Sequence, residues 1–369
     1  MLKIEPRKNR SNFLEVSAPV IAVILTMIFG GFLFLSMGKN PFEAIKLIFW
    51  DPIMSPTFSE YSRPRLVIKA APLILIALGL SFGFRANIWN IGAEGQYIMG
   101  ALFSGSIGLA LYPLDAWFIF PLMILGGIIG GIFWAMIPAI LKIKFNTNEI
   151  LVSLMLVYVA EQILALASVG FLRNPEGLGF PGSRDLSKYP SASNPELIAN
   201  SGIHVGVICS FIAVVFLTYF LTYHRLGFQI KLIGQAPKAA KFSGVNVNYI
   251  VIFCLGLSGG LAGIAGMFEL TGPAGLINID FNVGYGFTAI IVAFLGRLHP
   301  IGILFAGLLM SLTYVGGELA QFMLSIPAAA IQVFQGMLLF FLLSTDLLVS
   351  YKVSLNLGIN NSNSKSKSE

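Results

Sequence analysis

The sequence predicts an all-α integral membrane protein of about ten transmembrane helices. Three observations lead to this fold class: an apolar composition, a series of apolar segments of bilayer-spanning length, and glycines at helical spacing inside those segments. Hydrophobic residues make up 56% of the chain and charged residues only 11%, whereas about a quarter of the residues in a typical soluble domain are charged. So few charges could not cover the surface of a soluble chain of 369 residues.

Ten apolar segments are candidate spans, because a helix needs roughly 20 apolar residues to cross the hydrocarbon core. Eight of them have sufficient or nearly sufficient length, at residues 16–37, 66–82, 116–141, 150–172, 203–223, 249–270, 301–324 and 327–348. The other two, 88–111 and 281–298, are short or interrupted by polar residues or glycines. The expected organisation is therefore a cytoplasmic N-terminus at 1–15, a transmembrane domain at 16–350 and a disordered cytoplasmic tail at 351–369.

The distribution of lysine and arginine predicts the orientation. With ten spans and an inside N-terminus, most of these residues fall on inside segments, and the short outside turns at 112–115, 272–280 and 325 contain none. Basic residues gather in cytoplasmic loops, so both termini should be cytoplasmic. The two long outside loops are 38–65, where four prolines oppose a continuous helix, and 173–202, which is rich in Pro, Gly, Ser and Asn.

Two glycine series predict close contacts between helices. Gly126, Gly127, Gly130 and Gly131 form two overlapping GxxxG pairs, and a second series runs through residues 256–266. Small residues at this spacing allow helix backbones to approach each other in a membrane. We expect packing from these glycines and no ligand.

A polar, glycine-rich run, RANIWNIGAEGQ at residues 85–96, opens the interrupted span. Backbone that leaves helical geometry at membrane depth must be buried in protein or line water, because lipid offers no hydrogen bonds. We therefore predict a broken or re-entrant helix that faces the interior of the bundle, with Asn87, Asn90, Glu94 and Gln96 along a substrate pathway. The alternative is a cytoplasmic turn and helix cap that is merely polar.

The second short span, 281–298, occupies a matching position in the other half of the chain. Two interrupted segments in matching positions point to a transport site between inverted repeats. Three glutamates also lie in apolar segments, where a charge near the helix centre costs at least about 2.5 kcal/mol. Glu269 is expected to reach water at the outside end of its span, Glu161 to face the bundle or an interface, and Glu318 either to line the pathway or to form structural hydrogen bonds.

The inside loop 224–248 contains a short amphipathic stretch from Pro237 to Phe242. Proline suits the first turn of a helix, and apolar residues alternate with lysines. We predict a short helix that docks on a partner; the alternative is contact of the loop's lysines with anionic lipid. The residues assigned to docking are Gly234, Pro237, Lys238, Ala239, Ala240, Lys241 and Gly244.

Motifs for catalysis are absent from the sequence. It contains no G-x-x-x-x-G-K-[ST] phosphate loop and no GxSxG or HExxH motif. Cys209 and Cys254 both lie in apolar runs, without the Cys or His spacing of a metal site. We expect no catalytic residue, no metal and no cofactor, so that any ATP hydrolysis must come from a partner subunit.

Three segments resemble the permease subunits of bacterial nucleoside-type ABC importers. The run Asn90-Ile91-Gly92-Ala93-Glu94-Gly95-Gln96, after Phe84-Arg85, resembles a signature of that group. Asn148-Glu149-Ile150 with Leu154-Met155-Leu156-Val157-Tyr158 is similar to its NE…MLNY segment, with Val157 where asparagine is usual, and residues 234–244 are similar to its coupling loop. The resemblance covers residues 66–349, and the last two segments are shared with simple-sugar and branched-chain amino-acid permeases.

The resemblance implies about ten helices in two inverted repeats, as in the vitamin B12 permease type, in a bacterial inner (plasma) membrane. It implies a second, homologous permease subunit, an ATPase subunit that binds the coupling loop, and an extracytoplasmic substrate-binding lipoprotein. The implied function is ATP-driven import of nucleosides or similar small polar solutes, with simple sugars or branched-chain amino acids as the alternative. Membrane lipids are expected partners and nucleic acid is not. The coupling loop argues against an ion-coupled secondary carrier, which the glutamates and the broken helix would permit.

Overall fold

The computed structural model describes the backbone of residues 2–6 and 12–355 and the side chains of residues 17–345. Its helices are α1 (Asn12–Ser36), α2 (Pro41–Phe49), α3 (Asp51–Met54), α4 (Ser59–Arg85), α5 (Ala93–Ala110), α6 (Ile119–Phe145), α7 (Glu149–Val169), α8 (Val205–Tyr223), α9 (Arg225–Gln235), α10 (Pro237–Phe242), α11 (Val247–Thr271), α12 (Tyr285–Leu295), α13 (Pro300–Leu324) and α14 (Ala328–Ser350). Two 3-10 turns, η1 (Leu186–Lys188) and η2 (Ile279–Phe281), and two strands, β1 (Leu2–Pro6) and β2 (Tyr351–Leu355), complete the described elements.

The predicted all-α membrane fold is confirmed. Among the described residues, eight helices are long and apolar enough to cross a membrane: α1, α4, α6, α7, α8, α11, α13 and α14. The two remaining predicted spans correspond to α5 and to the shorter apolar segment Ile279–Leu295. In that segment α12 has only 11 residues, or about 16 Å of helix, which is half the thickness of the hydrocarbon core at about 30 Å.

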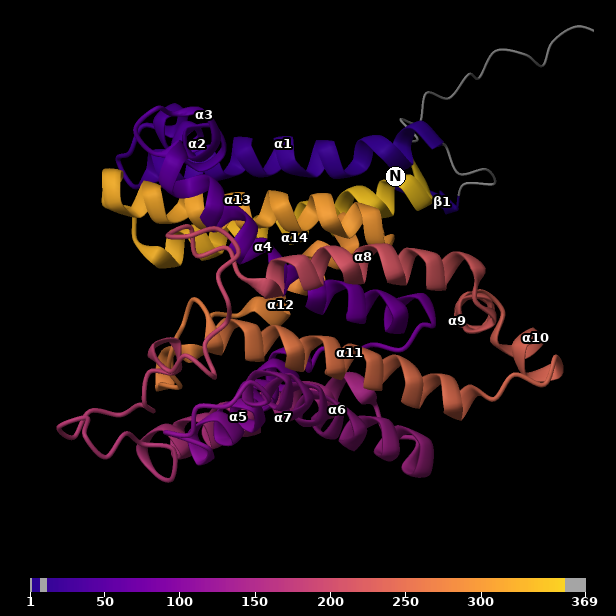
Figure 1. Cartoon of the computed structure of the whole chain (residues 1–369). Helices are drawn as coiled ribbons and strands as arrows, with labels where there is room; N and C mark the ends of the chain where they lie inside the picture. Colours follow the sequence, from indigo (N-terminus) through magenta and orange to yellow (C-terminus); the bar gives the residue numbers. More distant parts are fainter. Residues whose placement is uncertain (1, 7–11, 356–369) are drawn as a thin grey trace, which may run out of the picture. The chain divides into compact units, whose positions relative to one another are not determined.

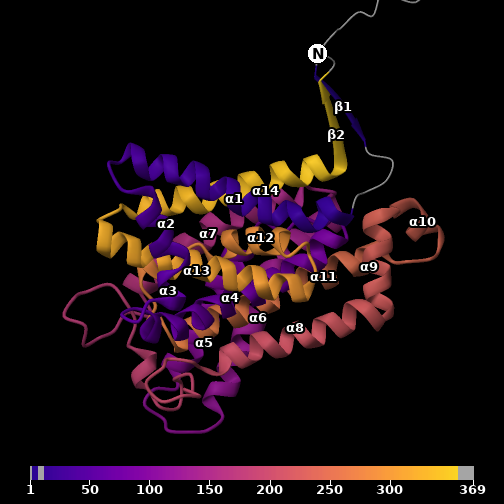
Figure 2. The ribbon, with the colours of Figure 1, turned by 90° about the horizontal axis from the view of Figure 1, so that it is seen from above.

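The chain forms two compact units, residues 1–45 with 324–369 and residues 46–323. In the first unit α1 and α14 lie side by side (Figures 1 and 2), and Phe34 stacks on Phe334 with ring centroids 5.8 Å apart. A Cβ at Gly30 would collide with the Phe334 ring, so glycine is needed for this approach. The first unit is therefore a helix pair joined by interlocking side chains.

The terminal segments of this unit differ from the sequence expectation. β1 pairs antiparallel with β2, with Leu2 opposite Leu355 and Pro6 opposite Tyr351, as the ribbon in Figure 2 shows. Residues 351–355, predicted as the start of a disordered tail, are thus a paired strand, and α1 begins four residues before the predicted boundary at 16. The rest of the predicted tail, 356–369, lies outside the described residues.

In the second unit α11 is the central helix, packed against α4, α5 and α6. A Cβ at Gly131 would collide with the backbone of Gly259, and one at Gly263 would collide with the carbonyl of Gly127. The same Gly263 backbone would be struck by a Cβ at Gly100 of α5. The glycine series on α6 and α11 therefore pack helices together, as predicted, because only a residue without Cβ permits this separation.

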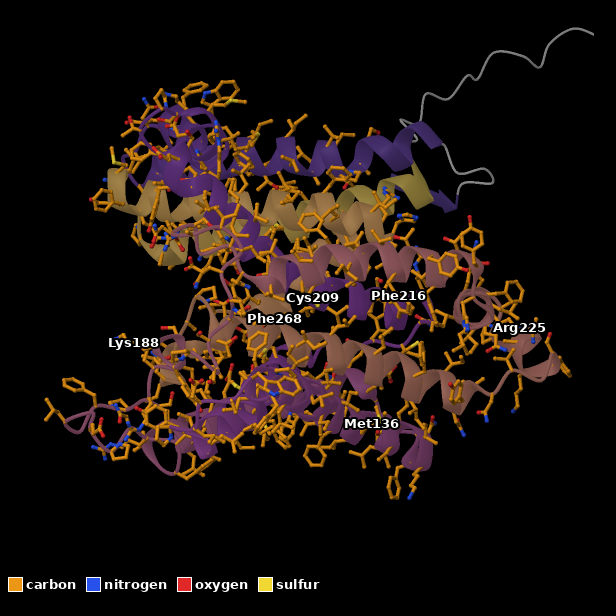
Figure 3. All side chains as sticks on the ribbon, in the orientation of Figure 1. Met136, Lys188, Cys209, Phe216, Arg225 and Phe268 are labelled. Carbon is orange, nitrogen blue, oxygen red and sulfur yellow. The ribbon has the colours of Figure 1, made fainter. Side chains whose placement is uncertain are left out.

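The two ends of the second unit carry different structures. At one end α9 and α10 extend beyond α8 (Figure 1), and at the other lies the long loop between α7 and α8. Figure 3 places Arg225 of α9 and Lys188 of the loop at these opposite ends. The loop is irregular apart from η1 and a single bridge between Glu196 and His204. The other predicted outside loop, 38–65, contains α2, α3 and the start of α4.

Candidate solute pathway

The second unit holds a cavity of about 950 Å³ at the end that carries the α7–α8 loop. This volume lies in the range of small-molecule sites, about 300–1,000 Å³. The walls come from the start of α4, the loop segment 187–204, the end of α11 and Tyr285 at the first position of α12. The lining mixes polar and apolar surface and carries both signs of charge, with Glu60, Arg65, Lys69, Glu196 and Glu269.

Glu318 is not part of the lining, but it forms ion pairs with two cations of the lining, Arg65 and Lys69. Its carboxylate is 2.7 Å from Lys69 Nζ and 3.2 Å from Arg65 Nη1. The Lys69 ammonium also lies 5.7 Å from the centre of the Tyr314 ring. An ion pair of this kind allows charged side chains to be held inside a membrane bundle. Glu318 therefore positions Lys69 and Arg65 at the cavity wall.

Two side chains of the cavity lining, Asn194 and His204, form a pair with unused hydrogen-bonding capacity. Nδ1 of His204 accepts from the Gly206 N–H (3.2 Å) and lies 2.9 Å from Asn194 Nδ2. Because Nδ1 is an acceptor, the proton of the neutral ring is on Nε2. Among the described residues neither His204 Nε2 nor Asn194 Oδ1 has a partner. The pair thus offers one donor and one acceptor, and buried polar atoms without partners call for a water or a ligand.

His204 is neutral at physiological pH. It lies at the N-cap of α8, outside the span itself, and burial lowers its pKa to about 4. A neutral ring is required for the hydrogen-bonding pattern of the pair, since protonation would remove the acceptor at Nδ1.

The polar run forms an irregular segment between the end of α4 at Arg85 and the start of α5 at Ala93. Asn90 is buried and is the centre of its hydrogen bonds. Its Nδ2 donates to Gln96 Oε1 (2.9 Å) and Ser258 Oγ (2.9 Å), and its Oδ1 accepts from Gly92 N–H (3.0 Å) and Gln96 Nε2 (3.1 Å). The side chain of Asn90 supplies partners that lipid would not provide, so the helix break is stable inside the bundle.

Glu94 connects this segment to the second short span. It is fully buried and accepts from the N–H of Gly284 (3.1 Å) and from the N–H of Gly286 at the start of α12. A carboxylate at a helix N-terminus is stabilised by the helix dipole and by the free N–H groups. Glu161 of α7 holds the same turn from another side, since Asn282 Nδ2 donates to it at 2.8 Å. The two interrupted segments therefore meet at their helix starts.

Tyr285 links this junction to the cavity. It lies between the two glycines that Glu94 holds and lines the cavity. Its ring contacts those of Tyr97 and Tyr314, with centroids 6.0 and 5.9 Å away. Asn90, Glu94 and Gln96 are not part of the cavity lining. Glu94 holds the start of α12, whereas Asn90 and Gln96 bond to each other and Asn90 also bonds to Ser258 of α11.

The sequence belongs to a known transporter family. Over residues 63–343 it matches the family described as "Branched-chain amino acid transport system / permease component". The chain is a member of this permease family. No solved structure gives a significant match to it.

Relatives of the permease include transporters of several solutes. A glucose ABC transporter permease protein of Haloferax volcanii is 30% identical over 364 residues, covering 96% of this chain and 94% of the relative. A nucleoside ABC transporter permease protein of Lactococcus lactis is 28% identical over 312 residues, with 82% and 84% covered. A guanosine ABC transporter permease protein of Bacillus subtilis is 25% identical over 332 residues, with 89% and 92% covered. The chain is accordingly a multi-pass membrane permease subunit of an ABC importer.

The predicted docking stretch of the permease is the separate helix α10, Pro237–Phe242. Within this helix Ala240 is buried. The exposed residues are Lys238, Ala239, Lys241 and Phe242, and Phe242 is 94% exposed. Gly234, at the end of α9, lies so close to the carbonyl of Arg85 that a Cβ would collide with it, and Gly244 adopts a positive φ of 78° after α10. The assignment of these residues to a partner interface stays a prediction.

The predicted pathway residues of the permease fall into three places. Asn90, Glu94 and Gln96 lie in the polar segment and the first turn of α5, where Asn90 bonds to Gln96 and Glu94 holds the start of α12, and Glu318 pairs with two cations of the cavity lining. Asn87 is apart from both groups: it is exposed, has a positive φ of 58° and accepts from Trp89 Nε1 at 3.0 Å. The roles of these residues in transport stay predictions.

Sequence reasoning missed most of the cavity lining. Tyr285 had a usable signal, because it stands between two glycines at the start of a half-length span. Asn194 and His204 had none, since they lie in an irregular loop and are joined only by the folded chain.

Proposed function

We propose that the permease forms part of the pathway of an ATP-driven importer of nucleosides, and that the solute enters through the cavity that Tyr285 lines in part. One observation carries this proposal: a cavity of about 950 Å³ with charged side chains of both signs is lined in part by the first residue of a half-length helix whose start is held by the buried Glu94. Discontinuous helices with their ends at a solute site are the usual construction of transport pathways.

The orientation follows from the charge distribution. The end with α9 and α10 carries Arg225, Lys231, Lys238 and Lys241 and is the cytoplasmic end, because basic residues gather on that side. The cavity then opens on the outside, towards a substrate-binding lipoprotein, and both termini are cytoplasmic. An ATPase subunit binds α10 from below and supplies the hydrolysis for which this sequence has no phosphate loop.

The architecture in this proposal is two inverted repeats of the vitamin B12 permease type, with a second homologous permease completing the pathway. The meeting of two interrupted segments at Glu94 supports it, since one comes from each half of the chain. Alternating access would then move the start of α12 and Tyr285 away from the cavity, with Asn90, Glu94 and Gln96 as positioning residues rather than solute contacts.

The cavity chemistry supports a nucleoside. A planar base can stack on an aromatic ring, a contact worth about 1–3 kcal/mol, and Tyr61 in the cavity lining, at 65% exposure, has a ring accessible for such a contact. His204 Nε2 and Asn194 Oδ1 are buried in the cavity wall without partners, so they would pair with the N–H and C=O edge of a nucleobase only if the loop opened around the solute. Glucose is the second candidate, because the relative with 30% identity over 96% of this chain is named for it.

The test uses proteoliposomes that contain the permease with its partner permease, ATPase and binding protein. We expect ATP-dependent uptake of labelled guanosine or uridine, inhibited by unlabelled nucleosides and not by leucine. Inhibition by glucose with none by nucleosides would establish the second candidate. Uptake by the permease alone, lost when the proton gradient is dissipated, would contradict an ABC importer and indicate an ion-coupled carrier.

The cavity itself is tested by a pair of cysteine variants. Ser193 lines the cavity, whereas Ser191 is a neighbouring loop residue outside the lining that hydrogen-bonds to Asp115. We expect a bulky, membrane-impermeant thiol reagent to block uptake by Ser193→Cys and to leave Ser191→Cys active. Equal inhibition of both variants would show that the loop, and not the cavity, is what the reagent disturbs.

A further inference from the structure

A second cavity, of about 330 Å³, lies at the opposite end of the same unit, beside the start of α9. It is formed where the ends of α4 and α8 meet α9 and the turn before α13. Three basic side chains line it, Arg85, Lys231 and His299. Among the described residues, no aspartate or glutamate lines this cavity.

The positive charge in this cavity has no counter-charge in the part of the chain that the structure describes. The ion pairs among the described residues do not include Arg85 or Lys231; Glu149, for example, pairs with Lys142. Arg85 uses Nε to donate to the carbonyl of Leu298 at 3.0 Å, which leaves the rest of its guanidinium available. Burial lowers the pKa of His299, and the charge of Arg85 lowers it further. Arg85 and Lys231 are the arginine and lysine of this lining, the two residue types whose ordinary pKa values lie well above neutral pH.

Such an arrangement favours an anion. Arg85 is half-buried, and a half-buried cation without an opposite charge is costly because it loses water without compensation, whereas Lys231 is exposed and adds its charge at the edge of the cavity. Gly227, in the first turn of α9, also lines the cavity, and the start of a helix adds partial positive charge and free N–H groups. Both effects are strongest for a compact oxyanion that can accept several hydrogen bonds.

The walls of the cavity indicate the rest of the ligand. Leu221, Phe228 and Pro300 provide apolar surface next to the basic groups. The cavity lies at the ends of two membrane-spanning helices, α4 and α8, which is the depth of lipid headgroups. Basic pockets between helices on the cytoplasmic side characteristically hold anionic lipid headgroups.

We propose that this cavity binds the phosphate of an anionic phospholipid through Arg85 and Lys231, with the lipid's apolar part against Leu221 and Phe228. The lipid would link α4 to α9, which already touch where Gly234 lies against the carbonyl of Arg85. Since α9 leads directly into α10, the bound lipid stabilises α9 and thereby the position of the predicted docking helix α10.

The experiment measures lipid retention by the purified full-length permease with native mass spectrometry. Phosphatidylglycerol and phosphatidylcholine are added at equal concentration, and we expect selective retention of phosphatidylglycerol. One basic residue near lipid contributes roughly fivefold in binding, so Lys231→Gln should lower the retention about fivefold, and Lys231→Arg should restore it. Arg225→Gln is the matched control, because Arg225 is an exposed cation of the same helix outside the cavity.

Three outcomes would overturn the proposal. Equal losses in Lys231→Gln and Arg225→Gln would indicate diffuse attraction to the protein surface. Displacement of phosphatidylglycerol by millimolar inorganic phosphate would identify free phosphate as the ligand. Retention by the isolated permease that disappears in the assembled importer would show that an acidic group of the ATPase fills the cavity.

Discussion

Removal of the Glu94 carboxylate should open the start of α12. Glu94 accepts from the backbone N–H groups of Gly284 and Gly286, which are not equally dependent on it. The Gly284 N–H also donates to Asn282 Oδ1 at 3.2 Å and keeps that partner, whereas the Gly286 N–H donates to Glu94 alone among the described residues. Glu94→Ala therefore leaves one buried donor without a partner, which costs about 1–3 kcal/mol.

The assay is hydrogen–deuterium exchange of the permease in lipid nanodiscs. If the cost falls on the local opening of α12, the amides at residues 284–290 should exchange roughly 5- to 150-fold faster in Glu94→Ala, since about 1.4 kcal/mol corresponds to a factor of ten. Glu94→Gln retains one oxygen acceptor and should show a smaller change. Glu161→Ala is the control: it removes only the bond from Asn282 Nδ2, so exchange at Gly286 should not change.

The alternative role of Glu94 is direct contact with the solute. In that case Glu94→Ala would lower uptake while exchange at 284–290 stayed at the level of the unmodified permease. Such a result would refute the assignment of Glu94 as a positioning residue for Tyr285.

Three further variants test packing, docking and the loop pair. Gly131→Ala should destabilise the permease by about 1–3 kcal/mol in thermal unfolding, and Gly126→Ala should destabilise it by less. The reason is that a Cβ at position 131 meets backbone, whereas a Cβ at position 126 meets the end of a side chain. Equal effects of the two variants would contradict close α6–α11 packing. Ala239→Glu, on the exposed side of α10, should leave folding and ATP hydrolysis intact and lower uptake. Ala240→Glu should also disturb the fold of α10, since Ala240 is buried. Normal uptake by Ala239→Glu would exclude docking at that position. The pKa of His204 is lowered to about 4 from an ordinary value of about 6.5, so the unfolded chain binds more protons between these values and the stability of the permease should fall as the pH drops from about 6.5 towards 4. His204→Gln should reduce this dependence of stability on pH in unfolding measurements. An unchanged dependence would refute the buried neutral ring.

The parts of the fold that the sequence predicted correctly depend on local patterns. Apolar length identified the spans, and glycine spacing identified the α6–α11 contact through Gly131 and Gly259. Proline at 237 and glycine at 244 bounded α10 within the inside loop. Each of these signals is carried by residues within one or two helical turns, so no knowledge of the tertiary structure is needed to use it.

The parts that could not be predicted depend on partners distant in sequence. Glu94 was recognised as unusual, but its acceptor role depends on N–H groups 190 and 192 residues further along the chain. Polar residues in an apolar segment fit a solute pathway as well as a structural junction, because both satisfy hydrogen bonds away from lipid. The pairing of Lys69 with Glu318, 249 residues apart, is equally invisible in the sequence.

The same contacts suggest how movement of α10 can reach the solute cavity. Gly234 of α9 touches the Arg85 carbonyl at the end of α4, and the Arg85 guanidinium donates to Leu298, just beyond the end of α12. After Arg85 the chain enters the segment that Asn90 holds, and Glu94 follows to fix the beginning of α12. A shift of α9 relative to α4 therefore acts on both ends of one 11-residue helix. Because α12 is short and Tyr285, its first residue, lines the cavity, we expect a small rotation of this helix to alter the cavity lining with less rearrangement than a movement of the long helices packed through glycine contacts around α11.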